Sequence, residues 1–221
     1  MLTIAFVTGT EPGKWFARFR RRTDHGTLTT IDSHDPLSLL EDGSADLALL
    51  RLPDGRIDSR FHQVALYGEA RGVAVPKDSI FAEVGEKVAA ADIDDEHLNY
   101  RITDDAGIDY EALADALQVV AAGVGVAIAP RPVLKVMSRK QVVPLELADP
   151  TVPETSIALV WLKDKDNDAI QDFVGVAKGR TANSSRQAAP KRTARDKALA
   201  KQARRGQRPG GGASRPGRKR R

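Results

Sequence analysis

The sequence predicts an α/β domain over residues 1–177, followed by a disordered basic tail over residues 178–221. Apolar runs rich in β-branched residues alternate with amphipathic segments of helical period, which is typical of a parallel α/β sheet. The tail has almost no large apolar residues, so burial cannot offset the entropy of ordering it. Charge divides in the same way. Residues 178–221 hold 16 Lys or Arg and one acid, a net charge of +15, whereas residues 1–177 hold 18 basic and 29 acidic residues, a net charge of −11.

The first third of the chain has the order β-α-β-α-β. We expect buried strands over residues 2–7, 27–31 and 46–52. The helix between the first two is expected to be capped by Thr10 and to end at Arg22. A second helix is expected over residues 37–41, opened by Asp35-Pro36. This order indicates a parallel sheet.

The remainder of the folded part continues the mixture of strands and helices. Leu113, Leu117 and Val120 share one face of a helical segment, which makes it the clearest amphipathic helix of the chain. The expected strands are 63–67, 72–75, 99–103, 124–129, 142–147 and 156–161, and the expected helices are 79–88, 110–122, 133–137 and 166–176. The pattern ends near Gly179, where the basic tail begins.

Composition excludes several kinds of site. The chain has no cysteine, which removes disulfides, thiolate nucleophiles and cysteine metal ligands. Its four histidines are scattered without metal-binding spacing, and it has neither a G-x-S-x-G elbow nor a phosphate-binding P-loop. No apolar run approaches a membrane span, and the N-terminus reads as a strand and not as a signal peptide. We therefore expect a soluble, cytoplasmic protein without metal, cofactor or membrane contact.

Five segments, in this order, resemble the effector-binding domain of LysR-type transcriptional regulators, a type 2 periplasmic-binding fold. The two most specific are L-x-x-G-x-x-D-L-A-L and a G-x-G turn that precedes a strand ending in proline. The five segments are residues 2–9, 36–49, 72–76, 120–130 and 156–161. The resemblance covers about residues 1–175. Members of this family carry a helix-turn-helix before the effector domain, whereas here the first strand begins at residue 2, so we expect no DNA-reading helix.

The resemblance implies two lobes and a regulatory, non-enzymatic function. Lobe I would comprise residues 1–72 and 160–177, and lobe II residues 73–159. A small-molecule effector, for which we expect an organic anion, would bind in the cleft between the lobes, and hinge closure would be the response. The family also pairs through the first helix and second strand, so a homodimer is expected unless the arginines at the end of that helix oppose it.

Candidate ligand-binding residues lie where expected strands end or glycines let the backbone approach closely. Arg51 would clamp a carboxylate, unless it is a surface arginine paired with Asp54 or Glu11. The resemblance places the turn at Gly123 in the cleft, although that glycine would also end a helix. The candidates are Thr8, Gly9, Thr10, Arg51, Thr103, Gly123, Gly125 and Pro130. Each has a plain structural alternative as a turn, a cap or a strand end.

Two other functions stay open. The tail would contact RNA or DNA without sequence preference, because it has many cations and no aromatic side chains for base stacking. The tail residues chosen for this contact are Arg204, Arg205, Arg208, Arg218, Lys219, Arg220 and Arg221. The second alternative hypothesis is an enzyme on the same fold. It is disfavoured because the chain lacks both a cysteine for cofactor attachment and the Thr-Arg-Phe motif expected of prephenate dehydratases.

Overall fold

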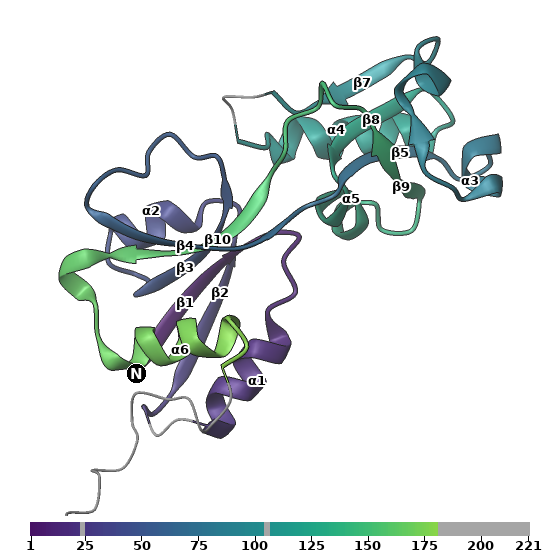
Figure 1. Ribbon diagram of the computed structural model, residues 1–221. Helices are drawn as coiled ribbons and strands as arrows, with labels where there is room; N and C mark the ends of the chain where they lie inside the picture. The colour runs from purple at the N-terminus through teal and green to yellow at the C-terminus, as the bar shows by residue number, and fades with distance from the viewer. Residues whose placement is uncertain (23–24, 104–106, 181–221) are drawn as a thin grey trace, which may run out of the picture. The chain divides into compact units, whose positions relative to one another are not determined.

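The computed structural model describes residues 1–22, 25–103 and 107–180. All of these residues belong to one compact unit, which contains two five-stranded sheets. The chain therefore has the two-sheet, two-lobed α/β architecture that the sequence predicts (Figure 1). None of the helices in the described ranges is long and apolar enough to cross a membrane.

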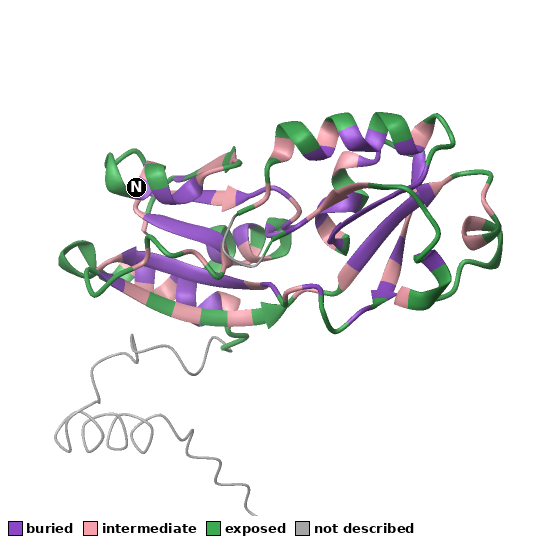
Figure 2. Cartoon of the chain, turned by 90° about the horizontal axis from the view of Figure 1, so that it is seen from above, coloured by how far each residue is buried: buried purple, intermediate pink, exposed green. Residues whose placement is uncertain are grey.

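The first sheet, which forms lobe I, has the strand order β2-β1-β3-β10-β4. Its strands are β1 (Leu2–Val7), β2 (Leu28–Ser33), β3 (Leu47–Leu52), β4 (Phe61–Gly68) and β10 (Ser156–Leu162). The first three strands run parallel, and β10 lies antiparallel between β3 and β4. Their continuous apolar runs fit a sheet covered on both faces (Figure 2).

Helices cover both faces of the first sheet. On one face, α1 (Gly13–Arg22) packs with α6 (Asp168–Ala177), where Phe16, Phe19 and Phe173 join the core. On the other face lies α2 (Pro36–Glu41). The side chain of Asp35 caps α2 by accepting a hydrogen bond from the Ser38 backbone N–H, and Pro36 occupies the first turn.

The second sheet, which forms lobe II, has the order β6-β9-β5-β8-β7. Its strands are β5 (Arg71–Pro76), β6 (Val88–Ala89), β7 (Leu98–Arg101), β8 (Val126–Pro130) and β9 (Val142–Ala148). One face packs on α4 (Tyr110–Ala121) and α5 (Arg131–Met137). The other packs on Phe81 of α3 (Ile80–Val84) and Ile93 of the 3-10 helix η1 (Ala90–Ile93).

The chain passes between the sheets twice. It leaves the first sheet after Gly68 and returns to it before Ser156, a few residues ahead of the passages expected at residues 72 and 160. The two passages are joined, because the Glu69 N–H donates to the Thr155 carbonyl at 2.8 Å and the Thr155 hydroxyl donates to the Glu69 carboxylate at 2.8 Å. A second 3-10 helix, η2 (Lys163–Lys165), connects β10 to α6.

Three local predictions were wrong. The helix expected over residues 79–88 ends at Val84, because Gly85 adopts a left-handed conformation (φ 70°) and caps it. Thr10 does not cap α1, which begins three residues later at Gly13; its hydroxyl donates instead to the Val7 carbonyl at 2.7 Å. The strand expected over residues 99–103 ends at Arg101. Asp104 and Asp105, considered as ligand groups beside Thr103, lie outside the described residues.

Candidate functional site

A pocket of about 480 Å³, which we call the main pocket, lies where lobe I strands end. Residues of lobe II contribute to its wall. Open α/β sheets place their ligands at such carboxyl ends of strands. The apolar part of the wall includes Pro36, Leu37 and Leu52 of lobe I, and Ile102 and Ile108 of lobe II. The polar part comprises His34, Asp35, Arg51, Asp54, Arg56, Thr103, Tyr110 and Thr155. The pocket thus combines an apolar wall with a few polar groups, as small-molecule sites usually do.

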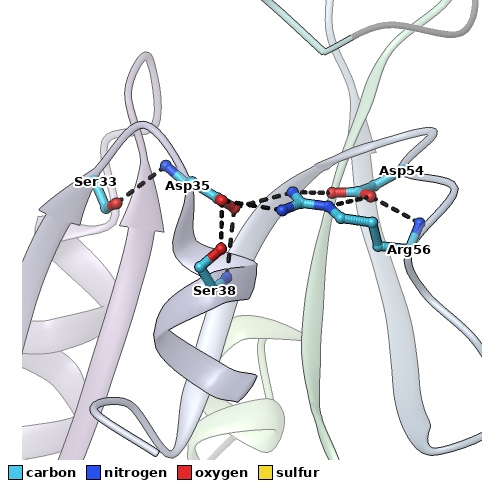
Figure 3. A network of polar contacts seen from close by, with 5 residues as sticks. All are labelled: Ser33, Asp35, Ser38, Asp54 and Arg56. Atoms are coloured by element: carbon cyan, nitrogen blue, oxygen red, sulfur yellow. Dashed lines mark hydrogen bonds and ion pairs between the residues drawn. The ribbon is translucent and has the colours of Figure 1, made fainter. Parts of the chain in front are cut away.

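One side of this pocket carries two carboxylates that share an arginine (Figure 3). Arg56 donates from Nη1 and Nη2 to Asp35 at 2.9 Å each. It also donates to Asp54, from Nε at 3.0 Å and from Nη2 at 2.7 Å. Both carboxylates hold further backbone or hydroxyl donors, since Asp35 caps α2 and Asp54 accepts from the Arg56 N–H at 3.0 Å. These three side chains together therefore carry one net negative charge.

The protonation behaviour of the cluster follows from these contacts. The hydrogen bond from Arg56 is the main cause that lowers the pKa of Asp35 from 3.8 to about 2. Burial opposes ionisation of Asp54, but its hydrogen bonds with Arg56 still lower its pKa. The two carboxylates in turn raise the pKa of Arg56. All three groups are charged at neutral pH.

Arg51, at the end of β3, makes a different kind of ion pair. Its side chain is 9% exposed, and that of its partner Glu69 is 1% exposed. Nε and Nη2 of Arg51 donate to the two carboxylate oxygens of Glu69 at 2.6 and 2.9 Å. Burial opposes the charge of Arg51, but the hydrogen bonds and charge of Glu69 leave its pKa raised. The interpretation of Arg51 as a surface arginine paired with Asp54 or Glu11 was wrong, since its acid lies on the passage between the sheets.

Arg51 also connects the two lobes. Its Nη2 donates to the Thr8 carbonyl at 3.1 Å, and its Nη1 donates to the Tyr110 hydroxyl of lobe II at 3.0 Å. The Tyr110 ring stacks on His34 of lobe I, with centroids 4.0 Å apart and an interplanar angle of 18°. His34 and Tyr110 line both the main pocket and a second one of about 770 Å³. The stacked pair therefore stands between two parts of the cleft.

The structure distributes the predicted ligand residues around these cavities. Arg51 and Thr103 line the main pocket, whereas Thr8 lines the second. The Thr8 hydroxyl lies 2.9 Å from His34 Nδ1 and 3.4 Å from Asp32 Oδ1. Gly9 has a positive φ of 95°, and a Cβ there would lie 3.0 Å from Val133 Cγ2. The side-chain space of Gly9 is therefore filled by α5 of lobe II.

The other predicted ligand residues line neither pocket. Thr10 is buried with its hydroxyl bonded to Val7. Pro130 pairs with Arg71 at the start of β5, beside the passage from lobe I. Gly123 and Gly125 lie at the other end of lobe II, because α4 carries the chain about 18 Å away from Tyr110 before β8 returns. The sequence predicts that Gly125 lets the backbone approach a ligand closely. In the structure the close neighbour is the backbone of His97, because a Cβ at Gly125 would lie 1.9 Å from the His97 carbonyl oxygen.

Sequence reasoning missed the residues that define the pocket. The sequence indicates Asp35 only as the opening of α2, Asp54 only as an alternative partner of Arg51, and Tyr110 only as the start of a helix. A usable signal existed, because Asp35 and Asp54 follow β2 and β3 within two residues, where parallel strands end at one edge of a sheet. The tail residues predicted to contact nucleic acid lie outside the described residues, so that interpretation stays a prediction.

Comparisons with known proteins agree with this architecture. The protein-family model for the LysR substrate binding domain matches residues 2–182. A search of curated proteins found no significant match. Solved structures with the same fold include PA01, a putative LysR family transcriptional regulator from Pseudomonas aeruginosa, with a TM-score of 0.59 and 19% identity, covering 80% of this chain and 70% of that one.

Two further solved structures give the same picture. HinK, a LysR family transcriptional regulator from Pseudomonas aeruginosa, has a TM-score of 0.58 and 18% identity, covering 80% of this chain and 68% of that one. A reduced form of OxyR from N. meningitidis has a TM-score of 0.58 and 16% identity, covering 80% of this chain and 93% of that one.

Proposed function

Because the chain belongs to the family of LysR substrate-binding domains, we propose that it is the sensor of a transcription regulator and binds a small organic effector in the main pocket. The family is regulatory and non-enzymatic, and its effector domains bind small molecules and often dimerise. The observation that carries the proposal is the position of the pocket. It lies at the carboxyl ends of lobe I strands and takes part of its wall from lobe II.

The two passages between the sheets give the proposed mechanism. An effector that contacts both Asp35 of lobe I and Thr103 of lobe II would favour the lobe arrangement in which both contacts are made. Residues 69–70 and 153–155 would absorb the movement, as the short connections in hinged proteins do. We propose the same division into lobe I and lobe II as the sequence indicates, with its boundaries moved from residues 72 and 160 to these two passages.

The charges of the pocket favour an effector that carries an amine or hydroxyl group over the organic anion expected from the sequence. Arg56 already makes four hydrogen bonds to the carboxylates of Asp35 and Asp54. The Nε and Nη2 donors of Arg51 already go to Glu69. An anion would have to displace one of these carboxylates and would lie beside the net negative cluster of Asp35, Asp54 and Arg56. A donor group would instead meet carboxylate oxygens, while its apolar body would rest on the Pro36 side of the pocket.

The test is thermal unfolding of the full chain with a metabolite panel and a matched probe series. Phenylpropylamine, phenylpropanol and phenylpropionate share one apolar body and differ in the terminal group. We expect stabilisation in the order amine, alcohol, carboxylate, because a ligand raises the unfolding midpoint according to its affinity for the folded state. The variant D35N/D54N should lose the preference for the amine, whereas D58N/D95N, which also removes two acids but lies outside the pocket wall, should keep it.

The outcomes distinguish effector binding in this pocket from the preference for an effector with an amine or hydroxyl group. If no member of the panel raises the unfolding midpoint, effector binding in this pocket is contradicted. If carboxylates stabilise the protein most and D35N/D54N strengthens them, effector binding stands and the organic anion replaces the donor-bearing ligand.

A further inference from the structure

Helix α1 presents a row of cations on its outer side. Phe16 and Phe19 point into the core of lobe I, so residues at positions opposite to them point outward. Lys14, Arg18 and Arg21 follow the spacing i, i+4, i+7 along this outer side and span about 10 Å of the helix. Arg20 and Arg22 flank the row. We call these five residues the α1 basic face.

The charges of the α1 basic face are not neutralised by the described part of the fold. Arg20 and Arg22 donate to the carbonyls of Leu28 and Arg180, and Arg21 donates to the Ala17 carbonyl of its own helix. No described acid forms an ion pair with any of the five. Elsewhere the described arginines that form ion pairs with acids are Arg51, Arg56, Arg60, Arg71 and Arg101. Residues 13–24 carry five cations and a single acid, Asp24.

Helix stability alone does not account for this arrangement. The last-turn arginines, residues 20–22, interact favourably with the helix dipole. Lys14 lies in the first turn, where the dipole disfavours a cation. Arg18 is four residues from both Lys14 and Arg22, and like charges at that spacing repel each other. Lys14 and Arg18 therefore oppose the stability of their own helix, which points to a requirement outside the fold.

The α1 basic face lies where the described chain ends. Nη1 of Arg22 donates to the Arg180 carbonyl at 2.9 Å, so the last described residue is held against the end of α1. Lys178 and Arg180 add two exposed cations there. Residues 181–221 hold 14 more Lys or Arg and one acid. A partner that contacts the α1 basic face thus also meets the cations Lys178 and Arg180.

We propose that the α1 basic face binds the phosphate backbone of nucleic acid without reading its sequence. Phosphate backbones have the charge density that a row of unpaired cations about 10 Å long can neutralise, and release of their counterions supplies the affinity. No aromatic or amide side chain stands beside the row on α1 to read base edges, since Trp15 is half-buried against Tyr67. This surface is separate from the effector pocket and does not depend on what that pocket binds.

The experiment uses the full chain, a fluorescent 20-bp duplex of mixed sequence, and anisotropy titrations from 50 to 200 mM salt. The test variant is K14Q/R18Q/R21Q. Each lost phosphate contact should reduce the magnitude of the slope of log affinity against log salt by about 1. The slope of the variant should therefore be smaller in magnitude by about 3. The loss should be the same on a second duplex of different sequence.

The control variant is K77Q/R139Q/K140Q, which removes three exposed lobe II cations that also have no ion pair with a described acid. It changes the net charge equally, from +4 to +1, and should keep the wild-type slope. A tail variant, R218Q/K219Q/R220Q/R221Q, separates the folded face from the tail. Unfolding midpoints establish that all variants are folded.

Two results would overturn the proposal. The first is a wild-type slope for K14Q/R18Q/R21Q while the tail variant loses salt dependence, because the tail alone would then bind. The second is unchanged duplex binding together with a shift from dimer to monomer in light scattering. That result would assign the α1 basic face to contact with a second copy, whose residues 1–177 carry a net charge of −11.

Discussion

Arg51 and Arg56 lie five residues apart near the end of β3, and each binds carboxylates, yet their surroundings differ. The Arg51 side chain is 9% exposed and pairs with one acid on the passage between the sheets, while that of Arg56 is 49% exposed and pairs with two acids at the pocket. Exposed pairs contribute little to stability, whereas breaking a buried pair leaves a charge without compensation. The buried pair at Arg51 therefore stabilises the passage between the sheets, whereas the pairs of Arg56 remain open to solvent and to the proposed effector.

The largest expected effect comes from breaking the buried pair. In E69Q the glutamine keeps the shape of Glu69 but leaves the buried charge of Arg51 unpaired. We expect the free energy of unfolding to fall by about 3–5 kcal/mol. Urea denaturation followed by circular dichroism measures this change.

The matched change at the exposed cluster is D54N, which removes one of the two acids of Arg56. Arg56 retains Asp35 and access to water, so the loss should stay below about 1 kcal/mol. Losses of similar size in E69Q and D54N would contradict the distinction between the two arginines.

A smaller effect is expected from the bond that links Arg51 to lobe II. Y110F removes the hydroxyl that accepts from Arg51 Nη1 but keeps the ring that stacks on His34. The expected loss is about 0.5–1.5 kcal/mol in the same urea experiment, the net value of one hydrogen bond. Y100F is the control, because the Tyr100 hydroxyl accepts from the Asp109 N–H within lobe II alone. An effect of Y100F as large as that of Y110F would argue against a special role for the interlobe bond.

Much of the fold was predictable because its signals are local. The parallel β1-β2-β3 core follows from apolar runs such as Leu47–Leu52, which are typical of strands covered on both faces. The expected helix over residues 79–88 failed for a local reason as well, since Gly85 ends it in a left-handed conformation. A glycine directly after a short helical segment commonly ends the helix in this way.

The site was less predictable because its contacts join distant residues. Glu69, the partner of Arg51, is 18 residues away, and Tyr110 is 59 residues away. Nothing in the sequence near Arg51 distinguishes these partners from Asp54, which is closer in the chain but binds Arg56 instead. Residues on two lobes meet only after both sheets have formed, so their pairing depends on the topology and not on spacing.

The smallest expected effect concerns the pH dependence of the exposed cluster. Arg56 lowers the pKa of Asp35 from 3.8 to about 2, so the ionised carboxylate stabilises the folded state above pH 4. This contribution is lost as pH falls from about 4 to 2. In D35N the asparagine still caps α2, because asparagine is a good cap, and only the charge is removed.

The difference in unfolding free energy between wild type and D35N should therefore be below about 1 kcal/mol at pH 6 and approach zero at pH 2. Urea unfolding of both proteins at pH 6, 4, 3 and 2 measures this difference. A difference that stays constant across the range would mean that the charge of Asp35 does not stabilise the fold. The charge of Asp35 would then contribute nothing to the stability of the protein without a ligand, in contrast to the charge of Glu69 in its pair with Arg51.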